Sequence, residues 1–279
     1  MRDSRQLRDL IKNKANELNV NPQLLLKRYF MEQMLERISS SNYSAQFILK
    51  GGMLISSIIG EGLRTTRDID ITLKNIKLDK REVNTIFEEI IKIDLNDKLD
   101  FTMISVEDIH EEFEYPGVRA TFEVKMEEIK DSFKIDITTG DVITPKEIEY
   151  GYVKILEDKQ ILIFSYPVET ILAEKIESII SKNIIGTRMR DFYDVYMLDK
   201  LHSKKLKNEI LKEAFANTIE KRNSTEYFQD VEDIIAAIEM SETLQNLWKN
   251  YANKNPYVGN VSFEDTIISI KNLIKRVVE

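Results

Sequence analysis

Cysteine is absent from this chain of 279 residues, and its two histidines, His110 and His202, are far apart in the sequence. The missing thiols exclude disulfides, thiolate metal sites and cysteine nucleophiles, and two distant histidines leave little for a zinc site. We therefore expect any bound metal ion to be held mainly by oxygen atoms.

Long apolar runs and an excess of positive charge are also missing. No stretch approaches the roughly 18 apolar residues that span a bilayer, and the opening MRDSRQLRDLIKNKANEL is too charged for a secretory signal. We therefore expect a cytoplasmic protein with no membrane partner. The net charge of −8 argues against broad capture of nucleic acid, although a local basic face could still dock an RNA.

The hydrophobic pattern predicts three successive textures along the chain. The first 45 residues read as two helices, the second starting at Asn21 and Pro22. Residues 46–164 contain short β-type runs and one helix at about 79–93, and the chain after Pro167 is helical again. We expect a mixed α/β (α+β) domain over 1–165 and a helical domain over 166–279, with a cleft between them. The predicted strands are FILK, IDITL, DFTMISV, VRATFEVKM, SFKIDIT, YVKIL and ILIFSY.

A glycine pair and an aspartate pair form the most informative stretch. Gly51 and Gly52 lie between a predicted strand and a predicted helix, where backbone N–H groups can approach a phosphate, although many glycine pairs simply end a strand. Asp68 and Asp70 share one face of the next strand, with Cα atoms roughly 6.6 Å apart. Such carboxylates repel unless a cation joins them, although a charged surface strand would show the same alternation.

Asp136, on the predicted strand SFKIDIT, adds a third carboxylate flanked by isoleucines. Three aspartates on neighbouring strands suit Mg²⁺, which takes its remaining ligands from water and substrate phosphates. Bound Mg²⁺ ions could activate an oxygen nucleophile and neutralise a leaving pyrophosphate. The pattern predicts phosphoryl or nucleotidyl transfer, and an exposed face of an antiparallel strand explains Asp136 equally well.

Charged residues in the helical part supply further candidates. Lys175 lies near the buried edge of its helix, where an ammonium needs an anionic partner, either a phosphate or a helix neighbour. Asp191 and Asp194 lie within an aromatic helix and are not typical solvated surface. The best local basic group for an RNA backbone comprises Lys182, Arg188 and Arg190, although a charge run at a helix start commonly just faces solvent.

Three sequence blocks together resemble a known family: LKGGMLI followed by RTTRDIDI, then YPVETILAEKIESII, then RMRDFYDVYML. They are similar to the AbiEii/AbiGii toxins of bacterial abortive-infection and toxin–antitoxin systems, which have the polymerase-β-like nucleotidyltransferase fold. The resemblance, over about residues 47–198, implies NTP-dependent nucleotidyl transfer that halts growth in phage defence. It implies GTP as the expected nucleotide, the 3′ end of tRNA as the expected acceptor and Mg²⁺ as cofactor. It also implies a cognate antitoxin encoded nearby, whose direct binding is left open.

The resemblance also assigns roles to individual residues. Gly51 and Gly52 match the nucleotide-binding turn, in which many nucleotidyltransferases carry serine at the second position. Asp191 ranks above Asp194 because only Asp191 matches the family's acid. The remaining assignments are the metal-binding pair Asp68 and Asp70, the third carboxylate Asp136, the triphosphate-binding Lys175, and Arg64, Thr66 and Arg67 as substitutes for the missing serine.

Two other functions stay open on the sequence. The same catalytic core could act on a protein side chain or a small molecule such as an aminoglycoside, because it does not specify the nucleophile. The chain could also be an NTP-binding regulatory module that transfers nothing. Labelling with each NTP in the presence of total RNA separates these alternatives.

Overall fold

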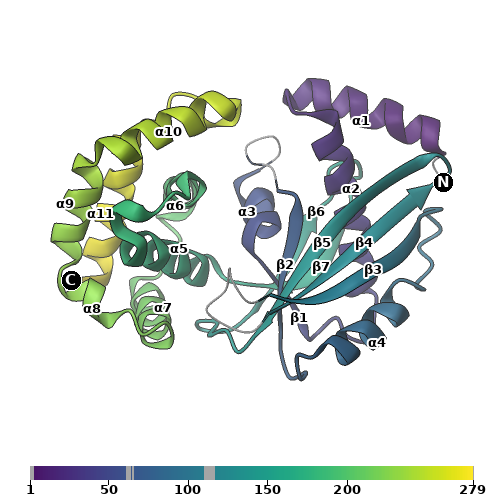
Figure 1. The fold of residues 1–279 in the computed structure, drawn as a ribbon, viewed down its shortest axis with the longest axis horizontal. Coiled ribbons are helices and arrows are strands. Elements are labelled where there is room, and N and C mark those ends of the chain that lie inside the picture. Colours follow the sequence, from purple (N-terminus) through teal and green to yellow (C-terminus); the bar gives the residue numbers. More distant parts are fainter. Residues whose placement is uncertain (1–2, 61–63, 65, 110–116, 279) are drawn as a thin grey trace. The chain divides into compact units, whose positions relative to one another are not determined.

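The computed structural model describes residues 3–60, 64, 66–109 and 117–278, so His110 lies outside the described residues. The chain divides into two compact units (Figure 1). The first comprises Met1–Asp141 and Ile148–Ser165, and the second comprises Val142–Glu147 and Tyr166–Glu279. The short segment 142–147 therefore belongs with the second unit, although it lies between two strands of the first.

A seven-stranded mixed sheet in the order β3-β4-β5-β2-β1-β7-β6 forms the centre of the first unit. β2 is parallel to β5 and β1 is parallel to β7, while the other neighbouring pairs are antiparallel. The strands are β1 (Phe47–Lys50), β2 (Asp68–Leu73), β3 (Asp100–Ile109), β4 (Gly117–Met126), β5 (Ile129–Thr139), β6 (Ile148–Val153) and β7 (Gln160–Ser165).

Three helices of the first unit begin at residues whose side chains cap them. Asp3 forms a capping box with Gln6 at the start of α1 (Ser4–Leu18). As predicted, Asn21 caps α2 (Pro22–Ser39), and Pro22 occupies its first turn. Asp79 accepts two backbone N–H bonds at the start of α4 (Lys80–Ile90). The remaining helix, α3 (Gly51–Ile59), follows β1 without a side-chain cap.

The two faces of the sheet differ in character because successive side chains alternate between them. One face is buried and apolar, and Phe87 of α4 packs on it with ring centroids 5.7 Å from Phe47 and 5.0 Å from Phe122. The opposite face of β2 carries Asp68 and Asp70. The core thus positions a polar row on the other side of the same strands.

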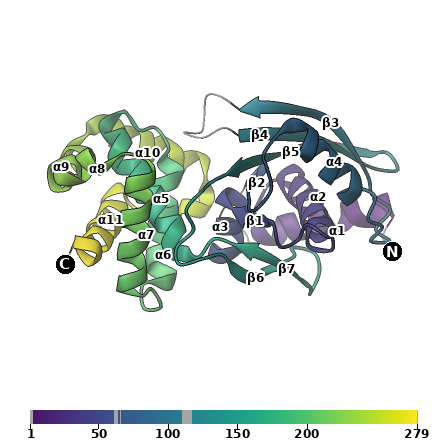
Figure 2. The same ribbon diagram turned by 90° about the horizontal axis from the view of Figure 1, so that it is seen from below.

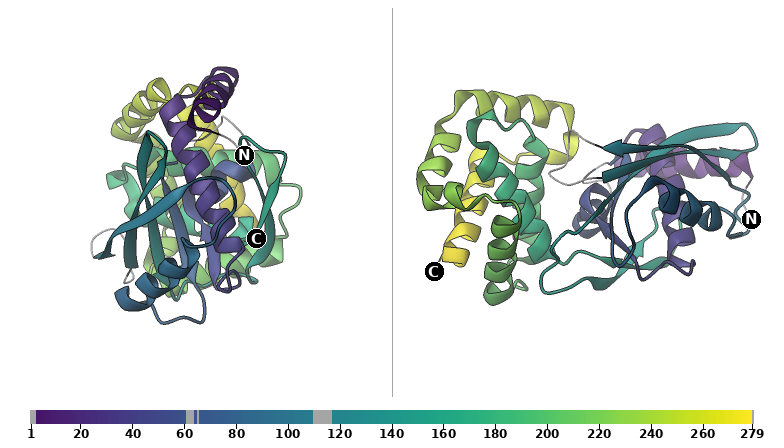
Figure 3. Two further views of the ribbon diagram at one scale, coloured as in Figure 1. Left: turned by 90° about the vertical axis from the view of Figure 1, so that its right-hand side faces the viewer. Right: turned by 60° about the horizontal axis from the view of Figure 1, so that its bottom comes forward.

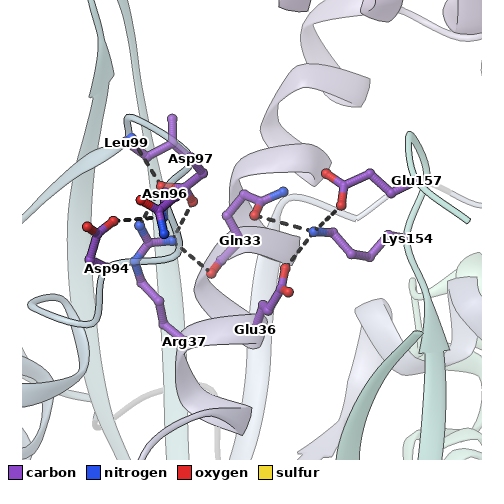
Figure 4. Close-up of polar contacts among 9 residues, drawn as sticks. All are labelled: Gln33, Glu36, Arg37, Asp94, Asn96, Asp97, Leu99, Lys154 and Glu157. Carbon is purple, nitrogen blue, oxygen red and sulfur yellow. Dashed lines mark hydrogen bonds and ion pairs between the residues drawn. The ribbon is translucent and has the colours of Figure 1, made fainter. Parts of the chain in front are cut away.

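Ion pairs tie α2 to the loops at the rim of the sheet (Figure 4). Arg37 donates two hydrogen bonds to Asp97, at 2.7 and 2.8 Å. Buried Lys154 lies 2.5 Å from a Glu36 oxygen and 3.0 Å from a Glu157 oxygen. Figure 4 shows these side chains converging from α2 and from the loops that follow α4 and β6.

The strand predicted at 152–156 is shifted in the structure. β6 begins earlier, at Ile148, and ends at Val153, where the Lys154 N–H bonds to the Lys159 carbonyl and closes a turn. The apolar pattern of YVKIL resembles a strand, but Lys154 and Ile155 are buried against α2 and not in the sheet. The pattern therefore did not indicate the turn.

The second unit is helical. α5 contacts α6 and α7, and α11 packs along α6 and α7 (Figures 2 and 3). Thr144, in the segment 142–147, exchanges hydrogen bonds with Thr170 of α5, which anchors that segment to this unit. Among the helices that the structure describes, none is long and apolar enough to cross a membrane. The helices are α5 (Val168–Lys182), η1 (Asn183–Ile185), α6 (Met189–His202), α7 (Asn208–Lys221), α8 (Thr225–Gln229), α9 (Val231–Met240), α10 (Glu242–Lys254), η2 (Pro256–Val258) and α11 (Phe263–Val278).

Candidate active site

The turn between β1 and α3 requires glycine at both of its positions. Gly51 has φ +62°, and a Cβ atom there would clash with the Asp70 carboxylate. A Cβ atom on Gly52 would lie 2.5 Å from the Thr66 hydroxyl oxygen. The Gly52 N–H donates to Asp70 Oδ2 at 3.0 Å. The turn and the carboxylate therefore fix each other's position.

The buried side chains of Arg64 and Thr66 pack against this turn. Arg64 is 3% exposed and donates from Nη1 to the Gly52 carbonyl at 2.7 Å. The Thr66 hydroxyl donates to the Asp68 carbonyl at 3.3 Å, and Arg67 is exposed. Arg64 and Thr66 occupy the space that a serine side chain at position 52 would need, which explains why glycine stands there.

Four charged residues form a row across four adjacent strands. Lys50 on β1 pairs in register with Asp70 on β2, which pairs with Asp136 on β5. Asp136 in turn pairs with Arg119 on β4. The row thus reads positive, negative, negative, positive, and two carboxylates face each other at its centre. Asp68 lies on the same face, two residues before Asp70.

Arg119 holds Asp136 through two hydrogen bonds, from Nε at 2.7 Å and from Nη2 at 2.8 Å. This bidentate geometry is the strong form of a carboxylate–guanidinium pair. The sequence reasoning did not find Arg119, because its partnership with Asp136 depends on the register of β4 against β5. The structure therefore gives Asp136 a protein partner in addition to its place beside Asp70.

Burial and like charge raise the pKa of both aspartates on β2. For Asp68 the main cause is burial, followed by the charges of Asp136 and Asp70. For Asp70, burial again raises the pKa most, the Gly52 N–H bond opposes it, and Asp136 adds to it. These carboxylates are costly as a group of anions, and a cation between them would remove that cost.

A second polar network, which the sequence reasoning missed, lies beside Asp70 on the same face. The Lys50 ammonium donates to the Thr138 hydroxyl and to Asp141, both at 2.6 Å. The hydroxyl groups of Thr138 and Thr72 also donate to Asp141. Lys50 is the residue just before Gly51, so the network secures the strand end from which the glycine turn leaves.

In the helical unit, Lys175 on α5 pairs with two aspartates of α6. Its ammonium forms an ion pair with Asp191 and lies 2.9 Å from Asp194 Oδ2. Asp194 is fully buried and Asp191 is 8% exposed. The helix periodicity predicted an anionic partner for Lys175, and the structure supplies two from the neighbouring helix.

The three basic candidates for RNA binding gather where α5 ends and α6 begins. Arg188 and Arg190 are exposed, and Lys182 is partly buried. Burial lowers the pKa of Lys182, and the nearby charge of Arg188 lowers it further. The positive charges of Lys182 and Arg188 therefore act on each other and could act together on an anion.

Comparison with known proteins decides the family. The model of the nucleotidyl transferase AbiEii toxins of type IV toxin–antitoxin systems matches residues 33–267. The chain belongs to this family. The match confirms the resemblance drawn from the three sequence blocks, and AbiEii proteins are nucleotidyltransferases.

Two solved structures resemble this AbiEii protein. A candidate nucleotidyltransferase from Helicobacter pylori has a TM-score of 0.50 and 14% identity, covering 92% of this chain and 96% of that one. JHP933 from Helicobacter pylori has a TM-score of 0.49 and 13% identity, covering 92% of each chain. The first likeness confirms the predicted mixed α/β fold followed by helices. A search of curated proteins found no match.

A divalent cation is implied by the nucleotidyltransferase family, and the β2 aspartates fit one. Asp68 and Asp70 offer hard oxygen donors on one face, and burial followed by the charge of Asp136 raises the pKa of both. Within the described ranges, no group of three or more acidic, histidine or cysteine residues is arranged to hold a metal ion. Because Mg²⁺ commonly takes its remaining ligands from water and from a substrate's phosphates, a pair of carboxylates suits it.

Proposed function

We propose that this AbiEii protein transfers a nucleotide from an NTP to an RNA in an Mg²⁺-dependent reaction that blocks translation in the cytoplasm. GTP is the proposed donor and the 3′ end of tRNA the proposed acceptor. The observation that carries the proposal is the pair Asp68 and Asp70 at a glycine turn whose second N–H already binds a carboxylate. A turn whose backbone N–H holds one anion, beside carboxylates that need a cation, suits a metal-bound triphosphate.

The proposed chemistry is a single displacement at phosphorus. The acceptor hydroxyl oxygen forms a bond to the α-phosphorus, the bond from that phosphorus to the bridging oxygen breaks, and pyrophosphate leaves with the bonding electrons. The proton of the hydroxyl passes to a carboxylate or to water. Mg²⁺, when bound, neutralises charge on the phosphates and lowers the pKa of the attacking hydroxyl.

The residues of the first unit divide this work. Asp68 and Asp70 would hold the cation, and the Gly52 N–H fixes the orientation of Asp70. Arg64 and Thr66 act through the turn they support, since both are buried against it. Asp136 is the proposed third carboxylate, and Arg119 fixes its position. In this scheme the protein contributes mainly by positioning charged groups around the reacting phosphates.

Residues 166–279 are proposed to contribute Lys175 and Asp191 to the same reaction. The family match spans both units, which supports a shared task. Asp191 and Asp194 compensate the Lys175 ammonium in the absence of substrate. We propose that a triphosphate takes over part of this compensation, with Asp191 as base or orienting group.

Labelling tests the proposal directly. The full chain is incubated with each α-labelled NTP, purified tRNA and total protein extract, with Mg²⁺ or with EDTA. We expect label from GTP in tRNA, only with Mg²⁺, and none with the Asp70→Asn variant. Label in a protein or a small molecule would overturn the RNA acceptor, and label nowhere would favour a nucleotide-sensing module. The acidic net charge of −8 makes the protein acceptor the main rival.

The antitoxin is the partner that the type IV family implies. We propose that a cognate antitoxin encoded nearby opposes the toxin's effect on growth. Co-expression of the toxin with its genomic neighbour tests this, since growth should recover only with the intact antitoxin. Co-purification of the two chains then decides whether they bind each other.

A further inference from the structure

A cluster of aromatic side chains adjoins the Lys175 and Asp194 pair in the helical unit. Tyr193 lies on α6, Trp248 and Tyr251 lie on α10, and Tyr257 lies on η2. The ring centroids are 5.2 Å apart for Tyr193 and Tyr257 and 5.7 Å apart for Trp248 and Tyr251. α10 packs against both α6 and η2, so the cluster lies where these three elements meet.

Two of these rings are partly exposed, whereas the two behind them are buried. Tyr193 is 1% exposed and Trp248 is 3% exposed, while Tyr251 and Tyr257 are intermediate. Tyr251 and Tyr257 are held by a hydrogen bond of 2.8 Å between their hydroxyl groups. The Tyr193 hydroxyl also donates to the Tyr257 carbonyl at 3.2 Å. Hydrogen bonds therefore hold Tyr251 and Tyr257 in place, and both rings remain partly exposed to solvent.

The two partly exposed rings lie beside α6, because the Tyr257 ring is 5.2 Å from the ring of Tyr193, the residue before Asp194, and the Tyr257 carbonyl accepts a hydrogen bond from Tyr193. Burial raises the pKa of the Tyr251 hydroxyl, and so do the hydrogen bond to Tyr257 and the charge of Asp194. The charge of Arg190 acts in the opposite direction. Asp194 Oδ2 in turn lies 2.9 Å from the Lys175 ammonium.

We propose that Tyr251 and Tyr257, here called the tyrosine pair, bind a nucleobase whose phosphates are met by Lys175. Aromatic side chains are general stacking platforms for nucleobases, because every base has a π-face. A tyrosine ring also offers a hydroxyl beside its apolar face. This inference rests on the proposed function and adds to it a base-binding surface within the helical unit.

The nucleobase could come from the donor NTP or from the terminal nucleotide of the acceptor RNA. Both present the same chemistry, a planar base next to a phosphate. The α,β-methylene analogue of GTP represents the donor and cannot be transferred. A single-stranded oligoribonucleotide represents the acceptor. Comparing the two probes assigns the tyrosine pair to one of these sources.

The experiment compares affinities of full-length variants by equilibrium dialysis with labelled probes in Mg²⁺. In Tyr251→Leu/Tyr257→Leu both rings are lost, in Tyr251→Phe/Tyr257→Phe they are kept, and Tyr227→Leu removes a 37% exposed tyrosine elsewhere. We expect the Leu pair to weaken binding of one probe about tenfold or more, and the other two variants to bind as wild type. The single tryptophan, Trp248, gives a second readout in wild type, since a bound base beside Tyr251 should change its fluorescence.

Unchanged affinity of the Leu pair for both probes would overturn the proposal. So would equal losses in the Leu and Phe pairs, because the hydroxyl network rather than stacking would then matter. Circular dichroism and the melting temperature establish that each variant is folded. If the Leu pair is not folded, the Trp248 fluorescence of the wild type decides, and no change on saturation with either probe would overturn the proposal. These outcomes are separate from the labelling experiment, because wild-type transfer to RNA can succeed whether or not the tyrosine pair binds a base.

Discussion

Opposing influences act on the pKa of the Asp70 carboxyl group. Its Oδ2 accepts the Gly52 N–H, which favours the charged form, while burial and the neighbouring Asp136 disfavour it. The balance leaves its pKa raised, so the charged form carries a cost in the protein without a cation. That cost is what a divalent ion would relieve.

The substitution Asp70→Asn removes the negative charge of this side chain and keeps its size and shape. We expect Asp70→Asn to abolish nucleotide transfer while leaving the melting temperature unchanged or higher, because like-charge repulsion is lost and an oxygen can still accept from Gly52. Thermal unfolding and the labelling assay measure both effects. Asp100→Asn, at an exposed aspartate that starts β3, is the matched control. Full activity in Asp70→Asn would contradict the metal-binding role.

At the scale of single residues, the sequence predicts which side chains share one face of a strand better than it predicts their ion-pair partners. The period of two placed Asp68 and Asp70 on one face, as the structure has them. The Arg119 partner of Asp136 and the Asp141 partner of Lys50 could not be predicted, because both depend on how strands distant in sequence align. Asp194 was ranked below Asp191, yet both contact Lys175, since residues three apart on a helix share a face.

At the scale of elements, the β1–α3 turn lies directly against the Asp70 carboxylate of β2. Gly51→Ala adds a Cβ at φ +62° that clashes with Asp70. Gly140→Ala also adds a Cβ at positive φ, +78°, but meets nothing within 4 Å. The two substitutions share the backbone strain of about 1–2 kcal/mol and differ in the clash.

We therefore expect Gly51→Ala to lower the free energy of unfolding by clearly more than Gly140→Ala does, and to abolish transfer, which Gly140→Ala keeps. Urea denaturation and the labelling assay measure the two effects. Equal destabilisation by both substitutions would show that the turn tolerates a side chain beside Asp70.

The end of β5 depends on Asp141. Burial alone would raise the pKa of Asp141, but the Lys50 charge and the hydrogen bonds from Lys50, Thr72 and Thr138 outweigh burial and lower it to about 2. An unfolded aspartate titrates near 3.8, so the unfolded chain binds more protons between these values. The charged form then contributes about 2 kcal/mol of stability above pH 4, which is lost as the pH falls from about 4 to 2.

Asp141→Asn should accordingly lower the free energy of unfolding at pH 7 by about 2 kcal/mol or more. It should also flatten the loss of stability between about pH 4 and 2. Urea titrations at several pH values measure this. Asp158→Asn, in an exposed turn, should leave both the value and the pH dependence as in wild type. An unchanged acid limb in Asp141→Asn would refute the role of the Lys50 network.

Element types were predictable where the periodic signal was strong. The helix caps at Asn21 and Asp79 and the strands around Asp70 and Asp136 follow from local residues. The error at β6 arose because Lys154 and Ile155 are buried by contacts with α2, and local sequence cannot distinguish such burial from a strand. The segment 142–147 joined the helical unit through Thr144 and Thr170, again a long-range contact.

At the scale of the whole molecule, the negative net charge limits where RNA can bind. A protein of net charge −8 repels a polyanion at long range, so an acceptor RNA must be held by a local basic group. Lys182 and Arg188 form such a group, since burial and then the charge of Arg188 lower the pKa of Lys182, and an anion between the two side chains would relieve their repulsion. We therefore expect few phosphate contacts and a shallow dependence of affinity on salt.

The double variant Lys182→Gln/Arg188→Gln tests this against a control of identical charge, Lys204→Gln/Lys207→Gln, at two exposed lysines between α6 and α7. We expect the first variant to weaken tRNA binding and to reduce the slope of log affinity against log salt by about 0.7 for each phosphate that the protein no longer binds. The control should change affinity only slightly, because it alters the net charge equally but not the local group. Both should bind the GTP analogue as wild type does. If the two variants weaken tRNA binding equally, the net charge governs docking and the basic group of Lys182 and Arg188 does not.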